Sequence, residues 1–210
     1  MLFKALLRRL NGGTDTASTK VPSSYRRSSN LIYERYPNLP GLVLTLLCNG
    51  RSLAIESADL DDYEVHPATY AHVVFPALEI VERSGLPHQY RNEFSAAVWH
   101  HIESPDWLIR EKAAKALSYV LDAKDLVNEA ERVLPTDSLS QNALHGRLLC
   151  LQFLLARSDV PMLAYEALVP WIHARWEKVI VKHPCPITAA TYVNILADLC
   201  ILLLRQRCKP

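Results

Sequence analysis

The fold is decided by one stretch, residues 104–117, which reads SPDWLIREKAAKAL. Ser104 can cap a helix with its hydroxyl oxygen, Pro105 suits the first helical position, and Asp106 complements the positive end of the helix dipole. Apolar residues then recur at helical spacing, and they are Ile109, Ala113, Ala116, Leu117 and Val120. The stretch therefore predicts an amphipathic helix that begins at Ser104.

Alanine on the apolar side of this helix favours close helix packing. Ala113 and Ala116 leave room for a neighbouring helix, which stacked helix pairs need if each repeat is to bury its face against the next. Arg110 follows Asp106 by four residues, so we expect it to bridge adjacent repeats through that carboxylate. The stretch resembles the second helix of a HEAT repeat. We expect an all-α fold, an armadillo- or HEAT-like α-solenoid of stacked antiparallel helix pairs.

Length and composition fit this fold and disfavour catalysis. A chain of 210 residues is enough for about four or five helix pairs, and we expect one solenoid segment over 1–210. Only six residues are glycine, and neither G-x-G-x-x-G nor G-x-x-x-x-G-K-[ST] occurs. Because such loops cradle phosphates, we expect no nucleotide, S-adenosylmethionine or other cofactor on this chain. We expect no small-molecule substrate and no enzymatic activity.

The cysteines are odd in number and scattered, without a C-x-x-C pair or a histidine at metal-ligand spacing. They are Cys48, Cys150, Cys185, Cys200 and Cys208. This pattern is typical of reduced thiols, and it predicts a cytoplasmic protein without a metal site. A Cys/His hydrolase would need one of these thiols beside a histidine in a cleft, and it is the weakest functional alternative.

Two apolar runs have some features of membrane or targeting segments. Residues 1–10 are short and interrupted by charge, so they predict a core helix rather than a signal peptide. Residues 187–204 are longer, but Asn194 and Asp198 interrupt them. We expect this second run to be a buried helix of the solenoid, with no membrane contact.

Charge is uneven along the chain. Residues 1–50 hold seven Lys or Arg against two acids, a net charge of +5, and the remaining residues sum to −4. The tract 11–30 is rich in Gly, Ser and Thr, which predicts a flexible basic loop, and residues 51–66 predict an acidic loop. Guanidinium groups bind phosphate well, so the basic end supplies the candidates for contact with RNA or a partner: Arg8, Arg9, Arg26 and Arg27. A merely solvated loop is the simpler alternative.

Periodicity and helix breakers predict the remaining helices. They are expected at 39–48, 67–83, 90–102, 122–134, 161–181 and 187–207, and no strand pair is indicated. Pro76 should kink or restart the second of these helices, and Pro170 should kink the fifth.

A second motif, residues 140–149, reads SQNALHGRLL. Ser138 and Gln141 have the spacing of a capping box, which predicts a helix that begins at Ser138. A core stripe then follows, formed by Leu144, Leu148, Leu151 and Leu155. Asn142 and His145 are expected to hold an interhelical turn by hydrogen bonds.

Four segments in order resemble the THADA family, the regulatory-subunit proteins of tRNA 2′-O-methylation. They are residues 1–10 (MLFKALLRRL), 33–39 (YERYPNL), 104–117 and 141–146 (QNALHG), so the resemblance spans roughly residues 1–155. The residues of the last two motifs are expected to be mainly structural, namely Asp106, Arg110, Asn142, His145, Gly146 and Arg147. The last 50 or so residues add only a helical pattern.

The resemblance implies a noncatalytic, cytoplasmic scaffold. Such a subunit holds a separate S-adenosylmethionine-dependent tRNA 2′-O-methyltransferase to tRNA, so that a ribose in the anticodon loop is methylated. Family members are much longer, so the chain is expected to be part of a longer protein. Their R-R-S-A-G-L-P element has no counterpart here, because residues 26–29 read RRSS without its continuation. A general HEAT-type interaction module, such as a transport or trafficking adaptor, is the main alternative.

Overall fold

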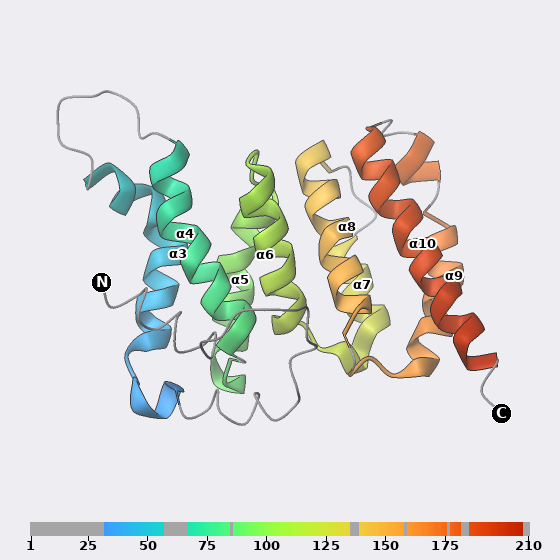
Figure 1. The fold of residues 1–210 in the computed structure, drawn as a ribbon, viewed down its shortest axis with the longest axis horizontal. Coiled ribbons are helices and arrows are strands. Elements are labelled where there is room, and N and C mark those ends of the chain that lie inside the picture. The colour runs from blue at the N-terminus through green and yellow to red at the C-terminus, as the bar shows by residue number, and fades with distance from the viewer. Residues whose placement is uncertain are drawn as a thin grey trace, which may run out of the picture. The chain divides into compact units, whose positions relative to one another are not determined.

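The computed structural model describes residues 32–56, 67–84, 86–134, 139–157, 159–175, 177–181 and 185–207. These residues contain helices and no strand (Figure 1). The α-helices are α3 (Leu39–Glu56), α4 (Pro67–Ser84), α5 (Arg91–Ile102), α6 (Trp107–Val120), α7 (Leu126–Val133), α8 (Gln141–Leu155), α9 (Met162–His173) and α10 (Pro186–Arg207). Short 3₁₀ turns lie at His88–Tyr90 and Ala123–Asp125, and a π-helical turn lies at Glu177–Val181.

The chain divides into two compact units, residues 1–98 and 99–210, with the division inside α5. In the first unit α3 packs against α4. Val43 and Leu78 are fully buried in that unit, and the Tyr33 hydroxyl is hydrogen-bonded to the Ser84 hydroxyl. Burial raises the pKa of Tyr33 to about 12. The predicted helix 67–83 is confirmed as α4, which continues through Pro76 instead of restarting there.

In the second unit α6, α8 and α10 pack side by side in that order (Figure 1). Arg110 near the start of α6 bonds to Asn142 near the start of α8, and Thr188 near the start of α10 bonds to Gln141. The N-termini of the three helices therefore lie at the same end, and the helices are parallel. The helices α7 and α9 pack against each other, α7 also against α8 and α9 also against α10.

The helix starts predicted at Ser104 and Ser138 are each two residues too early. Asp106 caps α6, because its carboxylate accepts hydrogen bonds from the amides of Leu108 (2.8 Å) and Ile109 (3.3 Å). Ser104 instead accepts from the amide of Asp106 at 3.2 Å. Ser140 caps α8 by accepting from the amide of Ala143 at 3.1 Å, so the expected capping box at 138 and 141 is not the start of this helix.

Helix lengths differ from the expectations at several points. The helix predicted at 39–48 continues to Glu56, so the first six residues of the predicted acidic loop 51–66 are helical. No proline interrupts them, and the single Gly50 is tolerated. The helix predicted at 122–134 is a 3₁₀ turn followed by α7, and the one predicted at 161–181 ends at His173. The predicted basic loop 11–30 and residues 57–66 lie outside the described residues.

The apolar C-terminal run is mostly exposed rather than buried. Within the described residues, Pro186–Leu204 is the one helix long and apolar enough to cross a membrane, with a mean hydropathy of 1.9 and 28% of the window buried. Tyr192, Ile195 and Leu199 are buried, and Tyr192 donates a hydrogen bond to the carbonyl of Ile172 at the end of α9. One face of α10 is therefore a packing face of the helical core, and the opposite face is exposed.

Candidate functional site

Arg110 is the centre of the contact between α6 and α8. Its side chain is buried, with only 7% of the residue exposed. Nε donates to Nδ1 of His145 at 3.1 Å, and Nη1 donates to Oδ1 of Asn142 at 3.2 Å and to the carbonyl of Ser104. Arg110 therefore joins two helices, as predicted. It does so through Asn142 and His145 of α8 and not through Asp106, which caps α6 instead.

The environment of Arg110 is unusual for a guanidinium. Burial lowers its pKa from the ordinary value, and the carboxylate of Asp106 and the thiol of Cys185 oppose that change. A buried arginine needs hydrogen-bond acceptors in place of water, and here they are the backbone carbonyls of Ser104 and Pro105, the side-chain amide of Asn142 and the imidazole of His145. Asn142 and His145 of α8, both predicted to form hydrogen bonds, thus accept hydrogen bonds from Arg110 of α6.

His145 is a neutral histidine held between Arg110 and Trp107. Its ring stacks on the Trp107 ring at a centroid distance of 4.6 Å and an interplanar angle of 28°. Burial, together with the neighbouring charge of Arg110, lowers the pKa of His145 to about 4. Because Nδ1 accepts from Arg110, the proton of the neutral ring is on Nε2, a buried atom without a hydrogen-bond partner among the described residues.

Gly146 lies within α8, in contrast to the expected interhelical turn. A Cβ at this position would lie 2.9 Å from Cγ of Arg110 and 3.0 Å from the carbonyl carbon of Ile102, and closer still to the Ile102 oxygen. Such distances are shorter than real Cβ contacts. Glycine is needed here because the backbone of α8 passes directly against the end of α5, and not because of a turn.

Arg147, the one charged residue of the second motif, points to the other side of α8. Its Nη2 forms an ion pair with Glu103 at 3.2 Å, and its guanidinium lies over the Trp99 ring at 5.0 Å from the centroid. Nη1 donates to the carbonyl of Val133 at 3.4 Å. Arg147 therefore ties α8 to the ends of α5 and α7.

Sequence analysis missed a second arginine that joins the same two helices. Arg157, just after α8, donates to the carbonyls of Ser118 and Leu121 at the end of α6, the latter at 2.9 Å. Asp159 holds its guanidinium through two contacts of 2.9 and 2.6 Å. The only sequence signal was the Arg-x-Asp spacing after a helix end. Arg110 and Arg157, which we call the two arginine clamps, fix the α6–α8 pair at its two ends.

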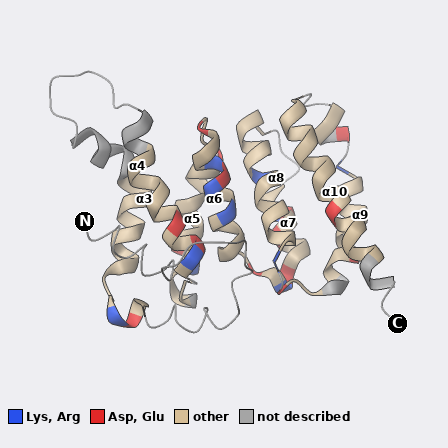
Figure 2. Cartoon of the chain, in the orientation of Figure 1, with Lys and Arg blue, Asp and Glu red and all other residues tan. Residues whose placement is uncertain are grey.

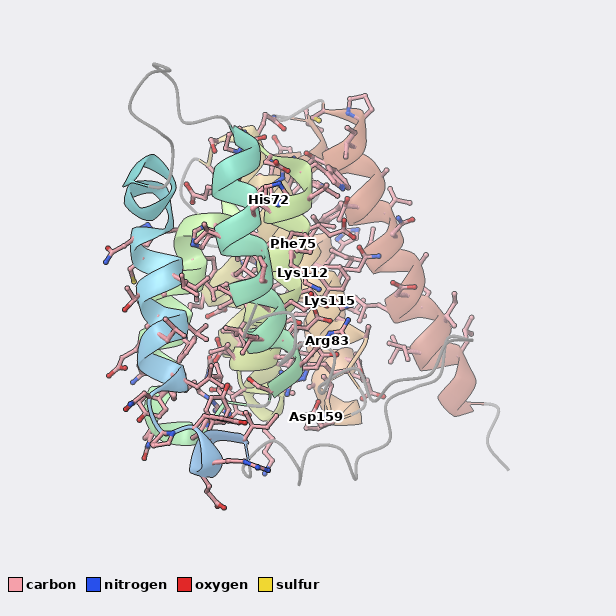
Figure 3. The ribbon with its side chains drawn as sticks, turned by 60° about the vertical axis from the view of Figure 1, so that its left-hand side comes forward. His72, Phe75, Arg83, Lys112, Lys115 and Asp159 are labelled. Atoms are coloured by element: carbon pink, nitrogen blue, oxygen red, sulfur yellow. The ribbon has the colours of Figure 1, made fainter. Side chains whose placement is uncertain are left out.

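The structure does not place the arginines that the sequence predicts to contact RNA. Arg8, Arg9, Arg26 and Arg27 lie outside the described residues. The helix α6 carries three basic residues and one acidic residue, namely Arg110, Lys112, Lys115 and Glu111, whereas α8 and α10 carry little charge (Figure 2). Lys112 and Lys115 lie three residues apart on α6 (Figure 3). Within the described ranges, no three His, Cys, Asp or Glu side chains are grouped to hold a metal ion.

The fold and this cluster define a helical-repeat protein in which the buried Arg110 and the partly buried Arg157 join α6 to α8. Residues 1–154 match the model of the family described as "Trm732, C-terminal TPR repeats", and the chain belongs to this family. The family is one of regulatory subunits in tRNA methylation. No solved structure matches the chain. The predicted all-α repeat class is confirmed, with repeats that the family describes as TPR.

Proposed function

We propose that the chain is a noncatalytic scaffold segment in tRNA ribose 2′-O-methylation. It holds a separate S-adenosylmethionine-dependent methyltransferase to tRNA, so that a ribose of the anticodon loop is modified. The observation that carries this proposal is the match of residues 1–154 to the Trm732 family. We also propose that the chain is part of a longer, cytoplasmic subunit of the THADA type, and the order of the four sequence segments supports this assignment.

The arginine clamps support a scaffold role rather than a chemical one. Arg110 is engaged with Asn142 and His145, and Arg157 with Asp159, so their guanidinium groups serve to hold helices in register. The imidazole of His145 stays neutral at physiological pH and is buried, and the thiol of Cys150 is buried. A rigid helical stack of this kind offers an extended surface on which an enzyme and a structured RNA are positioned.

The contact with RNA is assigned to the basic N-terminal region. Arg8, Arg9, Arg26 and Arg27 give it the net positive charge that phosphate binding requires. The helices of residues 99–210 then serve for packing and for the enzyme contact.

Co-purification tests the partner. When the protein is expressed with an affinity tag in its native organism and purified, a tRNA 2′-O-methyltransferase should co-purify with it and be identified by mass spectrometry. Gly146→Ala should reduce the recovery of the enzyme, because it disrupts the α6–α8 contact, and Gly41→Ala should leave it unchanged, because a Cβ there meets nothing within 4 Å. Recovery of transport or trafficking proteins without a methyltransferase would favour the adaptor alternative instead.

A further inference from the structure

The indole of Trp107 is exposed at the N-terminal end of α6. Trp107 is the first residue of this helix and exposes 40% of its surface, and Leu108 beside it exposes 62%. Against the indole lie the His145 ring, at 4.6 Å between centroids, and the Arg110 guanidinium, at 5.6 Å from the indole centroid. An aromatic side chain that stays exposed while a buried polar cluster fixes its position is suited to binding a ligand.

Both of these groups lie on the same face of the indole. Nε of Arg110 donates to Nδ1 of His145 at 3.1 Å, and groups on opposite faces of the ring would be too far apart to share that hydrogen bond. The imidazole and the guanidinium therefore form one layer against a single face of the indole. The exposed surface of the ring lies on its opposite face and its edges. A further planar group on that face would continue the stack.

Asn142 supplies a hydrogen-bond donor at the edge of this stack. Its Oδ1 accepts from Nη1 of Arg110 at 3.2 Å, which leaves its Nδ2 group for another acceptor. Asn142 is exposed and lies about one turn of α8 before His145. An exposed amide N–H₂ group beside a stacking ring can donate to the acceptor atoms on the edge of a base, or to ribose and phosphate oxygens.

The end of the helices at which Trp107 lies favours negative charge. The N-termini of α6, α8 and α10 lie together there. Asp106 compensates the dipole of α6, but Ser140 caps α8 with an uncharged hydroxyl, and no acidic residue lies in the first turn of α8 or α10. The positive ends of these two helix dipoles therefore attract phosphate groups to the neighbourhood of the ring.

We propose that the open face of Trp107 stacks on an unpaired base of tRNA, with Asn142 at the edge of that base. Aromatic side chains bind the bases of single-stranded RNA by stacking, and an anticodon loop presents such unpaired bases. The inference rests on the proposed function in tRNA methylation, and it adds an RNA contact to the packing and enzyme-contact roles of residues 99–210. A protein that covers the same ring is the alternative occupant.

Binding of the full chain to a tRNA anticodon stem–loop, and to a fully paired RNA duplex of equal length, tests the proposal. Trp107→Ala should weaken stem–loop binding roughly tenfold, and Trp107→Phe should weaken it much less, because phenylalanine still stacks. Neither change should affect duplex binding, because a duplex offers no unpaired base. The slope of affinity against salt should stay the same, since stacking releases no counterions.

Tyr119→Ala is the matched control. Tyr119 lies near the other end of α6 with a similar exposure of 41%, so its loss should leave stem–loop binding unchanged. Circular dichroism should show equal helix content in all three variants. Equal stem–loop binding by the wild type and Trp107→Ala would overturn the proposal, whereas the proposed function would fail only if anticodon-loop methylation did not depend on the gene. Unchanged RNA affinity together with a loss of methyltransferase recovery in Trp107→Ala would identify a protein as the occupant and overturn it too.

Photochemical cross-linking locates the base on the unsubstituted chain, so the result does not depend on how the variants fold. A stem–loop that carries 5-iodouridine in its loop is bound to the chain and irradiated, and the adduct is mapped by peptide mass spectrometry. The main adduct should lie on the peptide that contains Trp107. Adducts on other peptides only, or no stem–loop binding by the wild-type chain, would contradict the proposal.

Discussion

At Gly146 the α8 backbone passes close to the end of α5, so a single added methyl group at this residue should have a large effect. Gly146→Ala gains about 1 kcal/mol of helix propensity but forces the new Cβ against the Ile102 carbonyl and the Arg110 side chain. The overpacking should dominate, and the free energy of unfolding should fall by about 2 kcal/mol in urea denaturation.

Gly41 is the matched control for this substitution. It is exposed in α3, and a Cβ there would meet nothing within 4 Å. Gly41→Ala should therefore leave stability unchanged or raise it by up to about 1 kcal/mol. An equal response at both glycines would contradict the close approach described for α8.

His145 makes stability depend on pH. Its pKa is about 4 in the folded chain against roughly 6.5 when unfolded, so between these values the unfolded state binds more protons. Stability should be constant above that window and fall as pH decreases through it, by about 2 kcal/mol between pH 7 and pH 5.

The contribution of His145 is isolated by His145→Asn. Asparagine can still accept from Arg110 but does not titrate, so this variant should lose that part of the pH slope. Urea denaturation of both proteins at pH 5, 6 and 7 measures the difference. Parallel slopes in the wild type and the variant would show that His145 isn't the group responsible.

At the scale of elements, the two arginine clamps set the register of α6 against α8. Arg157→Ala would leave the carbonyls of Ser118 and Leu121 without this donor and remove the packing of the guanidinium over the Tyr119 ring. The free energy of unfolding should fall by about 2 kcal/mol. Arg132→Ala removes only an i,i+3 contact of 3.5 Å from an exposed arginine to the partly buried Glu129, and it should change the free energy of unfolding by less than about 0.5 kcal/mol. Equal effects would show that Arg157 is only a surface residue.

The positions of most elements were predictable because apolar periodicity and proline mark them directly. Their first residues were not, since Ser104 and Asp106 are both good caps and only the backbone decides between them. Pro105 favours an extended residue before it, and the Asp106 carboxylate also compensates the helix dipole. In the site, Arg110, Asn142 and His145 were predicted, but Arg157 was missed because its partners are backbone carbonyls, which leave no trace in the sequence.

The face of α10 shows a second limit of sequence patterns. Apolar residues on all sides of a helix predict burial, and here they predicted a buried helix. Periodicity shows which faces of a helix are apolar and would be stabilised by burial. It does not show which neighbour, if any, packs against each face. The exposed face of α10 therefore shows only in the packing of α8, α9 and α10.

At the scale of the whole molecule, the basic N-terminal region should carry the RNA contact. Replacing Arg26 and Arg27 with alanine should weaken tRNA binding at every sequence tested and reduce the slope of affinity against salt, since two phosphate contacts are lost. Lys124→Ala, an exposed change in the second unit, is the control. Electrophoretic mobility shifts at several salt concentrations measure both effects. An unchanged affinity and slope would make this region a merely solvated loop.

The central claim is that the chain supports tRNA ribose 2′-O-methylation without performing the chemistry. Nucleoside mass spectrometry of tRNA from cells lacking the gene tests it most directly. We predict a loss of 2′-O-methylated ribose at anticodon-loop positions, restored by the wild-type gene, with other modifications of the same tRNA unchanged. Unchanged levels of 2′-O-methylation in the anticodon loop would contradict the account.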